Sequence, residues 1–169
     1  MDTEINKKIE LKDKLINFYN SNKVKIYIFF IIVIMVSVLI IFLKVKLEKK
    51  NEKIAENYVR AGILLNSGNK EDSLDIYENI IISKNKFYSV LALNTILEKN
   101  LTIDEKKING FFETVEEALE TSDQKDLLRF KKALYLLKNG ENSKGNEILK
   151  SLIDKNSLFK SLSEEVITK

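Results

Sequence analysis

An uninterrupted apolar run of 18 residues constrains this chain more than any other feature of its sequence. Residues 26–43 read IYIFFIIVIMVSVLIIFL and contain no charged residue. As an α-helix, a run of this length extends about 27 Å, which matches the hydrocarbon thickness of a bilayer. A helix pairs its backbone donors and acceptors internally, so lipid can surround it. The run therefore predicts a transmembrane helix.

The residues around the run favour a membrane span over two alternatives. Lys25 and Lys44 flank it, and their side chains are expected to reach the lipid headgroups. A buried core helix would need a core that is apolar on every side. A cleaved signal peptide would have a shorter apolar run and a small-residue cleavage site, whereas FLKVKLEKK follows here. Lysines lie close to both ends of the run, so charge leaves its orientation open.

These features divide the chain into an N-terminal segment (1–25), a transmembrane helix (26–43) and a larger helical domain (44–169). Within the first segment, residues 4–19 place apolar side chains at helical spacing with lysines between them. They are Ile5, Ile9, Leu15, Ile16 and Tyr19. The segment is either an amphipathic helix on an anionic leaflet or a short solvated helix that leads into the span.

Composition argues against catalysis and against nucleic-acid binding. The chain has no histidine and no cysteine, so it lacks the commonest general base, thiolate chemistry and the usual transition-metal ligands. It also lacks a phosphate-binding glycine loop. The 28 basic and 25 acidic residues are mixed along the chain and form no one-signed patch. We therefore expect a protein that is not an enzyme and that holds no metal or cofactor.

From residue 46 onward the apolar residues recur with a helical period. Turn residues divide this region into seven segments: 47–66, 70–82, 86–99, 104–119, 123–138, 142–153 and 157–167. Each segment is amphipathic, so it must pack its apolar face against a neighbour. The short connections favour antiparallel helical hairpins. The domain is therefore predicted to be all-α.

One hairpin pattern occurs twice. A small residue is followed after seven positions by a turn glycine, then by a second small residue and a large one. The two sets are Ala61, Gly68, Ser73, Tyr77 and Ala133, Gly140, Gly145, Leu149. This spacing is typical of the tetratricopeptide repeat, and Ala92 would be the small residue of a middle pair. The pattern predicts a degenerate tetratricopeptide-like stack, with a generic helical bundle as the alternative.

In such a stack the first helix of each pair lines an inner face that binds peptides or partner helices. The residues expected there are Tyr58, Leu65, Asn66, Ser89, Leu93, Ile96, Phe130, Leu134 and Lys138. Tyr58, Asn66, Ser89, Phe130 and Lys138 are the candidate partner-binding residues. Because most of the set is apolar, the alternative is that these residues form plain core between the stacked pairs.

Residues 87–93 (FYSVLAL) and 127–135 (LLRFKKALY), together with the order of anchor, linker helix and helical domain, resemble the YfgM-type family. Members of that family are ancillary subunits of the bacterial SecYEG translocon. The resemblance implies a single-pass protein of the bacterial plasma membrane, with a cytoplasmic N-terminus and a periplasmic domain. It also implies a protein-binding scaffold whose partners are translocon subunits and periplasmic chaperones, with no small-molecule substrate.

Two other functions fit parts of the sequence. The first is a structural or assembly subunit of another membrane complex, such as a stalk built on one continuous helix. Gly68, Gly110, Gly140 and the turn clusters argue against such a helix. The second is a tetratricopeptide adaptor in envelope biogenesis or cell division. Limited proteolysis that leaves a compact domain starting near residue 50 would favour a scaffold over a stalk.

We expect the full-length chain to sediment with membranes when no detergent is present, because residues 26–43 are solvated by lipid. Fractionation by centrifugation, followed by immunoblotting of pellet and supernatant, measures this. A chain that stays in the supernatant would contradict the anchored arrangement.

Overall fold

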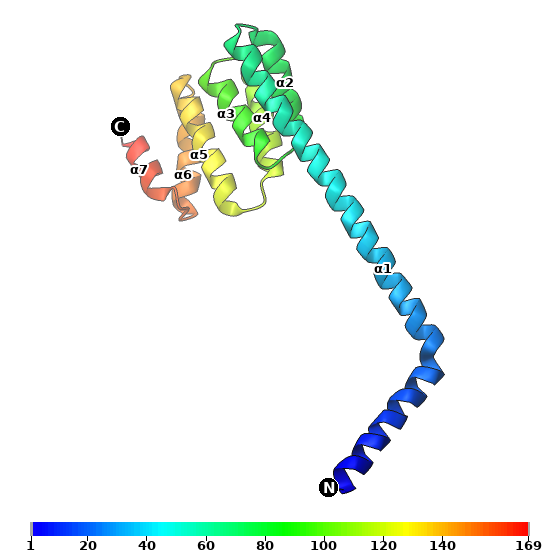
Figure 1. The fold of residues 1–169 in the computed structure, drawn as a ribbon. Helices are drawn as coiled ribbons and strands as arrows, with labels where there is room; N and C mark the ends of the chain where they lie inside the picture. Colours follow the sequence, from blue (N-terminus) through cyan, green and yellow to red (C-terminus); the bar gives the residue numbers. More distant parts are fainter. Residues whose placement is uncertain (1, 169) are drawn as a thin grey trace. The chain divides into compact units, whose positions relative to one another are not determined.

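The computed structural model describes residues 2–168, and the side chains of residues 12–168. The described residues form seven α-helices (Figure 1). These are α1 (Asp2–Asn66), α2 (Lys70–Ile82), α3 (Tyr88–Glu98), α4 (Glu105–Ala118), α5 (Ser122–Lys138), α6 (Asn142–Asp154) and α7 (Lys160–Ile167). The all-α prediction, with a long apolar helix followed by packed helical hairpins, is confirmed. The chain divides into two compact units, Met1–Lys50 and Asn51–Lys169.

The first unit consists of the N-terminal part of α1. Among the described helices, α1 alone is long and apolar enough to cross a membrane, as expected of a membrane anchor. Its large apolar side chains from Tyr27 to Leu43 are exposed. The Ser37 hydroxyl donates to the Val33 carbonyl oxygen at 2.8 Å. This bond satisfies the hydroxyl within the helix, as a lipid environment requires.

The sequence predicts separate helical segments at 4–19, 26–43 and 47–66, whereas α1 runs through all three. The chain has no proline, and Gly62 is its first glycine, so no residue in this stretch breaks a helix. Leu15, Ile16 and Tyr19 are exposed. The side chains of Ile5 and Ile9 lie outside the described residues.

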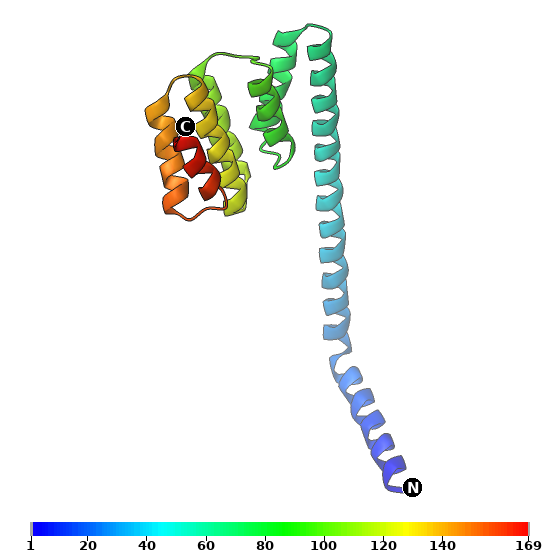
Figure 2. The ribbon, with the colours of Figure 1, turned by 90° about the vertical axis from the view of Figure 1, so that its left-hand side faces the viewer.

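The second unit is a stack of helical hairpins around an apolar core. Helix α2 packs against α3 and α4, α4 packs against α5, and α6 packs between α5 and α7. Figures 1 and 2 show α5, α6 and α7 running alongside one another. The bulkiest fully buried side chains are those of Tyr77 and Phe112. Each helix thus hides its apolar face against neighbours, as amphipathic helices must.

The two hairpins with the repeated pattern turn in the same way. Gly68 and Gly140 have φ values of +89° and +84°, in the left-handed region that glycine adopts without strain. The Gly68 amide donates to the carbonyl of Leu65, and the next amide donates to that of Leu64. The same pair of bonds recurs at Gly140, with the leucines at corresponding positions as acceptors. These are the hydrogen bonds of a glycine helix cap.

The small residues of the pattern allow close contact between paired helices. The Ser73 hydroxyl donates to the Ala61 carbonyl oxygen at 2.9 Å. In the other hairpin, a Cβ atom added to Gly145 would lie 3.0 Å from the Ala133 carbonyl oxygen. In both hairpins the second helix therefore approaches the backbone of the first at the same position.

Helix ends with left-handed backbone recur at a fixed interval. Gly68, Lys84 and Asn100 all have positive φ, and so do Gly140 and Asn156. Successive members of each set are 16 residues apart. Helix α4 ends differently, because its final residue is followed by Leu119 in an extended conformation (ψ 140°). These positions define which residues correspond between hairpins, with Asn100 as the counterpart of Gly68.

We expect Gly145→Ala to lower the free energy of unfolding by about 1–2 kcal/mol, because its methyl group would overlap tightly packed atoms. The nearest of these is Leu137 Cγ, 2.8 Å from the added Cβ. Gly110→Ala in α4 is the matched control, since no atom lies within 4 Å of its added Cβ. It should raise stability by up to about 1 kcal/mol through helix propensity alone. Thermal unfolding of the full chain in mild detergent, followed by circular dichroism, measures both. Equal stability of the two variants would contradict the close approach of α5 and α6.

A candidate partner-binding groove between α3 and α5

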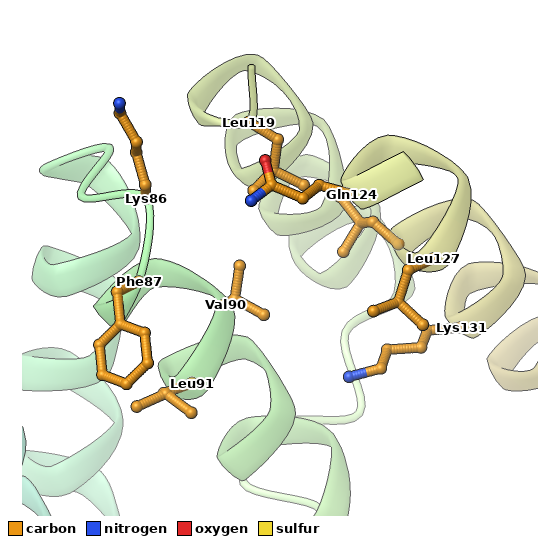
Figure 3. Close-up of a pocket in the computed structure, with 9 residues that line it drawn as sticks. Lys86, Phe87, Val90, Leu91, Leu119, Gln124, Leu127 and Lys131 are labelled. Atoms are coloured by element: carbon orange, nitrogen blue, oxygen red, sulfur yellow. The ribbon is translucent and has the colours of Figure 1, made fainter. Parts of the chain in front are cut away.

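An apolar groove runs between α3 and α5 and comprises two hollows. The first has a volume of about 220 Å³ and is shown in Figure 3. Its walls are Phe87, Val90 and Leu91 on the α3 side, and Leu127, Leu128 and Lys131 on the α5 side. The second has a volume of about 310 Å³ and continues between the same helices. Lys131 lines both hollows, so they adjoin one another.

Large apolar side chains are left uncovered along this groove. Phe87 is 63% exposed, and Leu127 and Leu134 are each 39% exposed. Helix α3 turns its other face inward, where Ser89, Leu93 and neighbouring residues are buried. On its other side, Val90, Leu91 and Leu97 are half-buried and line the two hollows. This distinguishes the groove from the core of the hairpin stack.

Contacts with α4 hold the α5 wall of the groove in place. The Arg129 guanidinium donates from two nitrogens to Glu116 Oε1, at 2.9 and 2.6 Å. The rings of Phe112 and Tyr135 pack with centroids 6.1 Å apart. At the start of α5, Thr121 and Gln124 form a reciprocal capping box. The wall is therefore part of the folded unit.

The edges of the groove are mainly basic. Lys86, Lys131 and Lys138 line it, and Glu98 is the single acidic residue among the described lining residues. Lys131 Nζ donates to the neutral Asn94 amide oxygen at 3.0 Å, across the groove. Lys86 lies 2.6 Å from Glu120, at an exposed position. The groove therefore favours ligands that combine apolar and acidic groups.

Tyr135 is the titratable hydroxyl of the second hollow. Burial raises the pKa of Tyr135, and the nearby carboxylates of Glu105 and Glu141 raise it further. Its phenol is therefore neutral at physiological pH and can donate a hydrogen bond.

Two of the residues expected on the inner face, Leu134 and Lys138, line the second hollow. Ser89, Leu93 and Ile96 are buried instead, and the Ser89 hydroxyl donates to the Ile80 carbonyl oxygen at 3.0 Å. These three side chains contribute to packing within the unit.

The remaining expected residues lie elsewhere in the second unit. Tyr58 packs against Tyr77 and Tyr88, with ring centroids 5.5 and 5.7 Å away. Phe130 stacks on Phe159 at 5.7 Å. Asn66 is exposed at the end of α1, and Leu65 packs against the core. The structure therefore does not bring the expected set together on one surface.

Each α3 residue expected on the inner face lies one position before an α3 residue that lines the groove. The expectation took Ala92 as the counterpart of Ala61, but alignment of the helix ends makes Leu93 that counterpart. One residue is about 100° around a helix, so this difference selects a different face. Moving each expected position forward by one gives Val90, Asn94 and Leu97, all of which line the groove. The 16-residue spacing of turn residues was the sequence signal for them.

In the first unit, Lys25 and Lys44 are exposed on α1, at the two ends of the apolar run. Their ammonium groups are placed where a span would meet headgroups.

The chemistry of the groove suits binding. Among the described residues, no group of three or more His, Cys, Asp or Glu side chains is arranged to hold a metal ion. Comparisons of the chain with protein-family models, with curated proteins and with solved structures find no match. The function is therefore argued from the geometry of the groove and the anchor.

The adjacent residues Leu127 and Leu128 test whether the groove is surface or core. Leu128 is 4% exposed, so Leu128→Ala should lower the free energy of unfolding by about 2–5 kcal/mol. Leu127 is 39% exposed and does not belong to the buried core, so Leu127→Ala should cost less than about 1 kcal/mol. Thermal unfolding of both variants in detergent measures the difference. Similar losses for the two would mean that the groove is closed and packed in solution.

Proposed function

We propose that this protein is a membrane-anchored protein-binding scaffold. One observation carries the proposal: a folded unit of helical hairpins leaves an apolar groove open between α3 and α5. That unit follows a helix long and apolar enough to span a bilayer. The anchor would concentrate the groove at the membrane surface, where it meets membrane-bound or newly translocated partners.

A protein ligand fits the groove better than a small metabolite. The hollows are lined by aliphatic and aromatic side chains, with polar groups at the edges. This is the composition of grooves that accept apolar side chains from a peptide or a partner helix. Exposed apolar residues are tolerated on a soluble surface when a partner covers them.

The proposed setting is the plasma membrane of a bacterium, with the N-terminus in the cytoplasm and the hairpin unit in the periplasm. The resemblance to ancillary translocon subunits supports this setting. Its two segments, 87–93 and 127–135, fall in and just before α3 and within α5, which are the helices that form the groove. We therefore propose translocon subunits and periplasmic chaperones as partners.

The packed hairpins of the second unit support a scaffold over a stalk built on one continuous helix. An adaptor in envelope biogenesis or cell division would use the same groove with other partners. Catalysis is not part of the proposal, because the chain offers neither histidine nor cysteine.

The absence of cysteine permits crosslinking from one chosen position. We expect Lys138→Cys, labelled in spheroplasts with a membrane-impermeant photocrosslinking maleimide, to form adducts with translocon subunits identifiable by mass spectrometry. Lys150→Cys on α6 is the matched control, because Lys150 is exposed but does not line the groove. It should label equally and give few of these adducts.

Other outcomes separate the parts of the proposal. Adducts from Lys138→Cys with different envelope proteins would retain the scaffold and remove the translocon assignment. Labelling only after the membrane is permeabilised would reverse the proposed orientation. Labelling without any adduct specific to Lys138→Cys would contradict a protein-binding groove.

A further inference from the structure

We infer that the groove binds an amphipathic α-helix that presents two large apolar side chains seven residues apart, with an acidic residue between them. This inference rests on the proposed scaffold function and specifies its ligand. It follows from the spacing of the two hollows and from the position of one lysine.

The two hollows repeat at an interval of seven residues on both walls. On α3, Val90 lines the first hollow and Leu97 lines the second. On α5, Leu127 lines the first hollow and Leu134 lines the second. Seven helical residues rise about 10.5 Å. Two apolar subsites therefore lie about two helical turns apart along the groove.

This spacing selects a helical ligand over an extended one. In a ligand helix, residues i and i+7 lie on one face, also about 10.5 Å apart. In an extended strand, side chains on one face are separated by about 6.7 Å or about 13.4 Å. The helical spacing equals the rise between the lining residues that are seven apart on each wall, whereas neither strand spacing does.

Charge determines which residue is expected between the two apolar side chains of the ligand. Lys131 lies midway between the hollows and is the one residue that lines both. Its hydrogen-bond partner Asn94 is neutral, so its positive charge has no counter-ion there. A carboxylate at ligand position i+3 or i+4 would meet this ammonium. Lys138, which lines the second hollow, adds to the preference for an acidic ligand.

Selection from a displayed library of 16-residue peptides tests the inference, using the full chain in lipid nanodiscs after depletion on empty nanodiscs. We expect enriched peptides to carry two large apolar residues seven apart, with Asp or Glu between them. Leu127→Asp and Leu134→Asp should each lower their affinity at least tenfold. Both leucines are partly exposed, and circular dichroism verifies that the variants fold. The matched control is Ile63→Asp, which adds the same charge at an exposed apolar site away from the groove and should leave affinity unchanged.

Charge reversal tests the central contact. Lys131→Glu should weaken the enriched acidic peptides at least tenfold. A matched peptide with lysine at the acidic position should bind Lys131→Glu better than it binds the unaltered chain. If the effects of Lys131→Glu and of the lysine in the peptide on affinity are simply additive, the proposed contact between Lys131 and the ligand carboxylate is wrong.

The alternatives give distinct results. Enriched peptides that bind Leu127→Asp and Leu134→Asp normally would overturn the groove assignment while leaving a protein-binding scaffold. Enrichment of basic or irregularly spaced peptides would overturn the inferred ligand alone. A dimer in detergent that both substitutions dissociate would show that the occupant is a second copy of the chain. The absence of any enrichment over empty nanodiscs would count against both the ligand and the scaffold function.

Discussion

The close approach of paired helices at small side chains is the contact on which the hairpin unit depends. Amphipathic helices of 8 to 17 residues are marginal alone and gain stability by covering each other's apolar faces. Ser73 against Ala61, and Gly145 against Ala133, bring the second helix of a pair onto the backbone of the first. Larger side chains at these positions would separate the helices and expose the core. Because this contact occurs in both hairpins, the two hairpins have the same local geometry.

This geometry also leaves the groove open. Helix α3 buries one face against neighbouring helices, and its remaining apolar stripe faces α5 across the groove. Because Arg129 and Phe112 tie α5 to α4, the wall opposite α3 is held where it stands. Leu127 and Leu134 on α5 stay partly exposed because no described helix covers them. The proposed partner helix would complete the packing in the way that neighbouring hairpins complete it elsewhere in the unit.

Most of the fold was predictable from the sequence because amphipathic period and turn residues are local signals. The six helices after α1 lie within a few residues of the predicted segments, whereas the continuity of α1 depended on the absence of helix breakers. The expected α3 positions differ by one residue from those that line the groove, because the expectation used Ala92 to align the hairpins. The position of Asn100, a left-handed helix end, sets it instead. Which face of a helix stays exposed depends on distant neighbours, so the amphipathic pattern of a single helix does not identify the groove.

The end of α4 differs from the other helix ends, and this difference affects how the width of the groove can change. Among the described helices from α1 to α6, all except α4 are followed by a residue with left-handed backbone. Helix α4 is followed by Leu119, whose backbone is extended. The short link after α4 joins this helix to α5, which forms one wall of the groove. Leu119 lines the first hollow, so a residue inserted or deleted after it would change the distance between the two walls and leave the lining residues themselves unaltered. The width of the groove can therefore change through one connection while the chemistry of its walls stays the same.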